Sequence, residues 1–141
     1  MKGAFVRVVV FGSLLVACGG GLSEVPRGPH PANGGAVPIV VDEAPPPPII
    51  ELVGPQPDSG CSWADGSWTF TDNEWVWRER GWVRAHDDCY LAEASLVWVP
   101  TVNQPGALFF TPSQWYQRGT GASCAEPPRC ASPKPPDTTS P

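Results

Sequence analysis

The sequence lacks most of the patterns that catalysis and metal binding require. It has two histidines, His30 and His86, and no pair of cysteines separated by two residues, so the usual ligand spacing of a zinc site is missing. The segment His86-Asp87-Asp88 contains a general base, but it falls in a predicted solvated turn and no G-x-S-x-G or similar nucleophile motif accompanies it. We therefore expect a protein that is not an enzyme and binds no metal or cofactor, with a small hydrolase as the most distant alternative.

Basic residues are also scarce. Beyond residue 17 the chain holds 14 Asp and Glu against seven Lys and Arg, because two of the nine basic residues, Lys2 and Arg7, precede that point. The formal charge of this part is about −7 at neutral pH. Such a charge opposes binding to nucleic acid or to an anionic bilayer surface.

Residues 1–17 have the pattern of a secretory signal peptide. A basic start is followed by an apolar run, Val8 to Val16, which is well short of the roughly 20 residues of a spanning helix. The run ends in Leu15-Val16-Ala17-Cys18, which resembles the lipobox of bacterial lipoproteins. The resemblance implies cleavage before Cys18, lipidation of its sulfur and acylation of the new amine, so that the protein reaches the membrane through a lipid anchor. The alternative is an ordinary cleaved signal that leaves Cys18 as a free thiol.

The residue after the cysteine bears on the location. In lipoproteins of this type an Asp at this position commonly causes retention in the inner membrane, whereas this chain has Gly19. The resemblance therefore implies an exported lipoprotein of the outer membrane of a Gram-negative bacterium.

Proline and glycine set off two flanking segments. Residues 18–60 combine the expected lipidated cysteine with a linker that holds 10 of the 19 prolines, including Pro45–Pro48, and residues 125–141 form a proline-rich tail. Neither flank is expected to fold, and the linker should stiffen into polyproline II, with an upper length on the order of 100 Å. Two β-prone runs, 37–41 and 49–53, are expected to lie along the folded domain as edge strands rather than to dock on a partner.

All seven tryptophans fall in the remaining part, residues 61–124. Helical periodicity is missing there, while Trp75-Val76-Trp77 and the run 96–99 have the aromatic and β-branched enrichment of strands. We therefore predict a mainly β fold, a small tryptophan-rich domain of antiparallel hairpins or a meander, flanked by disordered proline-rich segments.

An internal repeat predicts how the first hairpin pairs. The segment from Trp63 to Trp68 recurs 14 residues later as Trp77 to Trp82, with a polar turn, residues 71–74, between the two copies. Because two rings five residues apart fall on opposite faces of a regular strand, a bulge or kink is expected near Gly66 and Gly81. Counting outward from the turn predicts three aromatic pairs: Phe70 with Trp75, Trp68 with Trp77, and Trp63 with Trp82.

The hexapeptide WADGSW, residues 63–68, resembles the repeat of the YXWGXW (WXXGXW) family of short bacterial exported proteins and lipoproteins. The match is good from Trp63 to Trp82 and fades beyond it, so the chain is similar to a divergent member. That family has no established biochemical activity. A second hairpin is expected from 89–99 and 108–117 around a turn at 103–106.

With Cys18 assigned to lipid, four cysteines remain. An even number in an exported chain implies two disulfides, with three possible connectivities. The most local arrangement, which we expect, pairs Cys61 with Cys89 and Cys124 with Cys130.

Three classes of function stay open. The first is a non-catalytic, lipid-anchored envelope protein that contributes structure or protein contacts. The second is a module that binds peptidoglycan or exopolysaccharide by stacking exposed indole rings on sugars, with Trp63 and Trp115 as the candidate platform. Because so small a domain has little else to bury, most of the tryptophans are expected to form the core. The third is the hydrolase.

Overall fold

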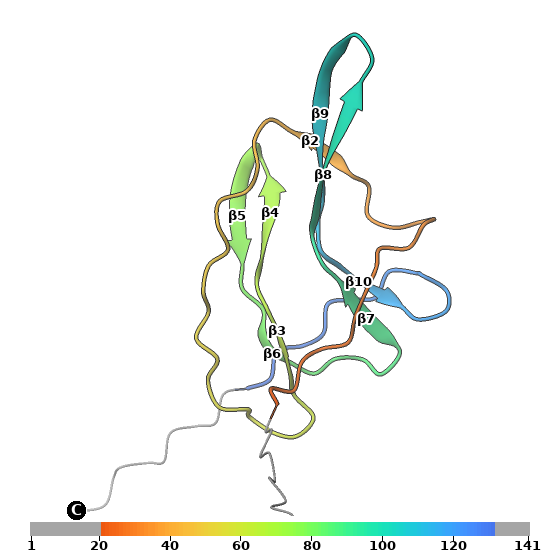
Figure 1. Ribbon diagram of the computed structural model, residues 1–141. Coiled ribbons are helices and arrows are strands. Elements are labelled where there is room, and N and C mark those ends of the chain that lie inside the picture. Colours follow the sequence, from red (N-terminus) through yellow and green to blue (C-terminus); the bar gives the residue numbers. More distant parts are fainter. Residues whose placement is uncertain (1–20, 132–141) are drawn as a thin grey trace, which may run out of the picture.

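The computed structural model describes residues 21–131, and every regular element in that range is a β-strand (Figure 1). The prediction of a mainly β fold is confirmed. The expected signal peptide, Cys18 and the end of the proline-rich tail lie outside the described residues. The strands are β1 (Arg27–Gly28), β2 (Ile39–Val41), β3 (Ser62–Ala64), β4 (Ser67–Thr71), β5 (Glu74–Arg78), β6 (Gly81–Val83), β7 (Cys89–Ala92), β8 (Ser95–Thr101), β9 (Gln104–Thr111) and β10 (Gln114–Gln117).

Strands β3 to β6 form one long hairpin, called here the tryptophan hairpin. Its turn is the two-residue loop Asp72-Asn73, and both residues have positive φ angles, 51° and 67°. Asp and Asn tolerate this conformation, which matches the right-handed twist of the paired strands. The predicted register is confirmed for all three aromatic pairs, whose rings meet edge to face: Phe70 with Trp75, Trp68 with Trp77, and Trp63 with Trp82.

The tryptophan hairpin is interrupted where a kink was expected. Asp65 and Gly66 separate β3 from β4, and Glu79 and Arg80 separate β5 from β6. Gly81 follows with φ at 78°, a conformation that side chains rarely adopt. The paired indoles of Trp63 and Trp82 lie on the far side of this interruption from the turn.

Strands β8 and β9 form a second hairpin, called here the apolar hairpin, which projects from the rest of the domain (Figure 1). Its turn lies at Val102-Asn103 rather than at the predicted residues 103–106, because Asn103 takes the positive φ of 66° and the residues after it already pair with β8. Pro105 fits within β9, since β2 pairs only with the later part of that strand, residues 108–110. Strands β7 and β10 continue the two arms as an antiparallel pair.

The linker does not stand apart from the domain. Val25 is buried in the core, and β1 pairs in parallel with β7. As predicted for residues 37–41, β2 lies along the domain as an edge strand, against β9. Residues 49–53 were expected to form a similar strand but do not, and they run beside the tryptophan hairpin without pairing. Part of the linker, which was not expected to fold, thus packs on the domain, because Val25 is buried in the core and β1 and β2 pair with β7 and β9.

All four predicted cysteines form disulfides, but their pairing differs from the expected local arrangement. Cys61 pairs with Cys130 and Cys89 with Cys124. The reason is the path of the carboxyl-terminal segment, which returns along two strands: Cys130 donates its N–H to the carbonyl of Trp82, and Cys124 donates to that of Trp115. The first contact brings Cys130 close to Cys61, and the second brings Cys124 close to Cys89.

Candidate functional site

The two tryptophans predicted to form an exposed platform are buried. Trp63 is 6% exposed and Trp115 is 3% exposed. Trp115 packs in the core with Val25 and Leu91, while Trp63 stacks on Trp82. The platform prediction is wrong because rings at the ends of the aromatic zone lie where the hairpins join, and the core forms there.

The tryptophan with the most exposed ring is Trp98 of β8, 59% exposed, which sequence reasoning did not select. A methyl group on Gly106 of the facing strand would come within 2.6 Å of the indole, so the ring covers that glycine. The sequence around it favours the opposite outcome: Trp98 stands in an uninterrupted apolar run, Leu96 to Val99, which is typical of a strand buried on both faces.

The apolar run makes β8 an unusual edge. All seven residues of β8 are exposed, and none of them is charged. In the sheet order β2-β9-β8 the strand has a neighbour on one side only. Its free edge carries none of the charges that commonly protect an edge strand, although Pro100 limits its length. This surface, residues 95–99, is called here the β8 edge.

A second surface lies on the tryptophan hairpin and is covered by the chain itself. Residues 45–54, called here the docked segment, run beside β4 and β5 (Figure 1). Three indole N–H groups donate hydrogen bonds to it: Trp68 to the Pro47 carbonyl at 3.3 Å, Trp77 to Glu51 Oε1 at 3.1 Å, and Trp82 to the Gly54 carbonyl at 3.1 Å.

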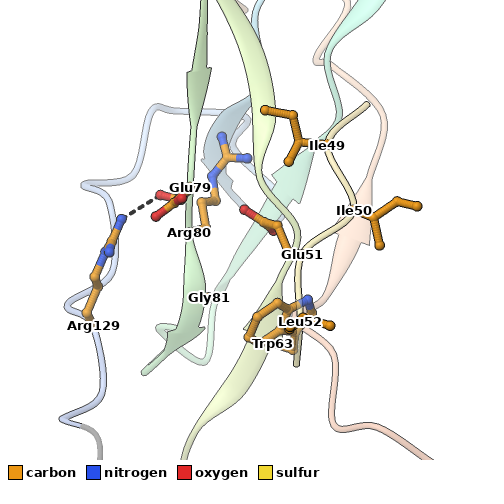
Figure 2. Close-up of a pocket in the computed structure, with 9 residues that line it drawn as sticks. All are labelled: Ile49, Ile50, Glu51, Leu52, Trp63, Glu79, Arg80, Gly81 and Arg129. Atoms are coloured by element: carbon orange, nitrogen blue, oxygen red, sulfur yellow. Dashed lines mark hydrogen bonds between the residues drawn. The ribbon is translucent and has the colours of Figure 1, made fainter. Parts of the chain in front are cut away.

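Figure 2 shows a cavity between the docked segment and the kink of the tryptophan hairpin, lined in part by Glu51, Trp63, Arg80 and Arg129. The guanidinium of Arg80 is buried and donates to the Asp65 carbonyl at 3.1 Å and to Ser67 Oγ at 3.0 Å. Burial lowers the pKa of Arg80. Arg80, which lies between β5 and β6, therefore connects the two arms of the hairpin at the kink through buried hydrogen bonds.

A charged cluster fastens the linker to the kink. Arg27 of β1 contacts Asp65 at 2.7 Å, Glu93 at 2.6 Å and Glu24 at 3.6 Å. The hydrogen bond from Arg27 lowers the pKa of Asp65, which also accepts from the indole of Trp63 at 2.8 Å. These carboxylates are committed to structural contacts.

The residues considered for catalysis or metal binding also make contacts within the domain. Asp88 accepts from the side-chain amide of Gln117 at 3.0 Å, and the carbonyl of His86 accepts the N–H of Cys89, as in a turn. His30 contacts the Tyr116 hydroxyl at 3.2 Å and the Glu93 carbonyl at 2.7 Å. Within residues 21–131 no group of His, Cys, Asp and Glu is arranged to hold a metal ion.

Comparisons with family models, curated proteins and solved structures found no match to this chain. In the described part of the chain, no helix is long and apolar enough to cross a bilayer. The structure offers two candidate surfaces, the β8 edge and the tryptophan face under the docked segment.

Proposed function

We infer that this protein is a non-catalytic, lipid-anchored protein of the bacterial cell envelope whose β domain makes protein contacts through the β8 edge. The observation that carries the inference is an uncharged, largely apolar edge strand in which every residue is exposed. An extended partner segment that adds to this edge forms main-chain hydrogen bonds and covers the side chains of Leu96, Val97, Trp98 and Val99. Burial of apolar area stabilises such a contact by about 25 cal/mol per Å² before the cost of association.

Several observations support the envelope location. Two disulfides need an oxidising compartment to form and persist, which is the setting that a signal peptide supplies. The lipobox-like Leu15-Val16-Ala17-Cys18 and the likeness to WXXGXW repeats point to an outer-membrane lipoprotein. We therefore propose Cys18 as the lipidation site and the membrane, through that lipid, as one partner.

A glycan-binding module is the second candidate. The exposed indole of Trp98 favours it, because an exposed ring can stack on a sugar. Sugar sites also need polar groups close to the ring, whereas Trp98 pairs across the hairpin with Leu108 and its indole lies over Gly106. The protein-contact proposal therefore stands first.

The test is site-specific photo-cross-linking in cells. A photoreactive residue at Val97, 54% exposed on the β8 edge, is compared with one at Val76, 48% exposed on the tryptophan hairpin. We expect discrete protein adducts from position 97 and none from position 76. Adducts to glycan from position 97 favour the second candidate, and equal patterns from both positions overturn the proposal.

The anchor is tested separately, in the same strain. Fatty-acid labelling of the full chain and its disappearance in Cys18→Ser are the expected results. A label that persists in Cys18→Ser, or no label in either chain, contradicts the lipid anchor.

A further inference from the structure

The docked segment is attached to the tryptophan hairpin by directed polar contacts rather than by apolar burial. Ile50 and Leu52 are 92% and 95% exposed, so they point away from the hairpin. No helix or strand includes any residue from 45 to 54. The segment is attached by hydrogen bonds from three indole N–H groups and by one from the main-chain N–H of Gly66 to the carboxylate of Glu51.

The contacts are spread along the segment at intervals of four and three residues. Pro47, Glu51 and Gly54 each accept from a different tryptophan, which defines three subsites over eight residues. Aromatic surfaces that donate to the free carbonyls of an extended, proline-rich chain are the usual means by which such chains are recognised, since these chains lack internal hydrogen bonds. The tryptophan face thus has the chemistry of a site for extended peptides.

The middle subsite selects a carboxylate. Glu51 Oε2 accepts the main-chain N–H of Gly66 at 2.8 Å while Oε1 accepts from the indole of Trp77 (Figure 2 shows Glu51 reaching towards the hairpin). A methyl group on Gly66 would lie 2.5 Å from Glu51 Oε1 and 2.7 Å from the Trp77 ring, so the glycine of the WADGSW hexapeptide makes room for both. The charge of Arg80 interacts favourably with that of Glu51.

We propose that the tryptophan face of β4 to β6 is a binding site for extended, proline-rich peptides of a partner protein that carry a carboxylate four residues after a proline, and that the docked segment occupies it as a tethered ligand. The docked segment itself displays the chemistry that the site accepts. This surface lies on a different hairpin from the β8 edge, although Leu96 of that edge lines a cavity together with Trp68 and Trp77. The peptide-site proposal does not depend on the β8 contact, because its hydrogen bonds come from the tryptophan hairpin.

Tethering sets the conditions under which a partner binds. A ligand joined by short linkers competes at an effective concentration of about 1 mM, so a partner peptide has to displace the docked segment. A substitution that weakens binding of the docked segment without changing the tryptophan face should therefore make the site available to a partner peptide.

The test measures binding of a synthetic peptide of residues 44–54 to the full chain by tryptophan fluorescence and calorimetry. The peptide should bind Glu51→Ala about tenfold or more tightly than the wild-type chain, because the variant's own segment has lost two hydrogen bonds to its carboxylate. Adding Trp77→Phe to that variant, which removes one indole donor and keeps a ring, should weaken binding, whereas adding Trp98→Phe should leave it unchanged. A peptide with alanine in place of its glutamate should bind at least about tenfold more weakly.

Three results overturn the proposal: no binding to Glu51→Ala with its two disulfides intact, equal binding of the alanine peptide, or equal effects of Trp77→Phe and Trp98→Phe. If Glu51→Ala does not fold, millimolar peptide is titrated into the wild-type chain and the indole N–H resonances are followed. Shifts confined to Trp68, Trp77 and Trp82 support the site, and shifts at Trp98 alone or at none of them contradict it. Light scattering of the wild-type chain distinguishes a partner from a second copy, since mutual exchange of docked segments would give a dimer.

Discussion

Both hairpins of this domain are closed by two-residue turns, but they differ in what covers them. The tryptophan hairpin places its indoles against the core and the docked segment, and every ring in it is at least partly covered. The apolar hairpin has β2 paired with β9, whereas no strand of the described residues pairs with the outer edge of β8, and Trp98 stays exposed. The comparison teaches that aromatic content does not determine burial here. Burial follows from which other part of the chain packs over each ring and each strand edge.

The largest expected effect on stability comes from removing the indole of Trp63, where the tryptophan hairpin meets the core. Trp63→Ala should lower the free energy of unfolding by about 3 to 5 kcal/mol, because it leaves a cavity beside Trp82 and removes one of the hydrogen-bond donors to Asp65. Denaturant unfolding with the disulfides intact measures this. A loss below about 1 kcal/mol would show that the hairpin is not fastened through this ring.

The next effect comes from releasing the carboxyl-terminal segment from the tryptophan hairpin. Replacing Cys61 and Cys130 together by alanine removes a crosslink between residues 69 apart and should cost about 2 to 4 kcal/mol. The matched control replaces Cys89 and Cys124, which are 35 apart, and should cost slightly less. Peptide mapping without reduction checks the pairing directly, and fragments joining Cys61 to Cys89 would refute it.

A smaller effect is expected at the kink, and it depends on pH. The pKa of Asp65 is lower in the folded chain than its unfolded value of about 3.9, so its contact with Arg27 stabilises the fold above about pH 4 and is lost as the pH falls further. Asp65 is more than half exposed, so Asp65→Asn should cost less than about 1 kcal/mol at pH 7. Unfolding curves of both chains from pH 7 to pH 3 should converge in acid, and a constant difference would contradict this assignment.

The smallest effect on stability belongs to the apolar hairpin. Trp98→Ala should change the free energy of unfolding by less than about 1 kcal/mol, since the ring covers little besides Gly106. The same change should abolish the adducts formed at position 97. A large loss of stability would mean that the β8 edge is part of the core, and the contrast between the two hairpins would fail.

Sequence reasoning succeeded where one local rule acts alone. Counting outward from Asp72-Asn73 gave the three aromatic pairs, because register in a two-residue hairpin is set by the turn. It failed where distant segments compete for one surface. The partners of Cys61 and Cys89 depend on how residues 124–130 return along the strands, which no local spacing encodes.

The candidate surfaces illustrate the same limit. Trp63, Trp98 and Trp115 are alike as residues, and their exposure depends on which edge the linker covers. The uninterrupted run 96–99 was visible in the sequence but fits a buried strand equally well. Only the sheet order, with β8 outermost, separates the two interpretations.

The burial of Val25 limits how far this part of the core can lie from a lipid anchor at Cys18. Val25 packs in the core seven residues after Cys18, and a chain spans at most about 3.5 Å per residue. If Cys18 carries the lipid as we propose, this core residue stands within about 25 Å of the anchoring sulfur. The apolar hairpin projects at the opposite end of the domain from the first described residues (Figure 1), so a protein that adds to the β8 edge meets it farther from the anchoring sulfur than Val25 lies.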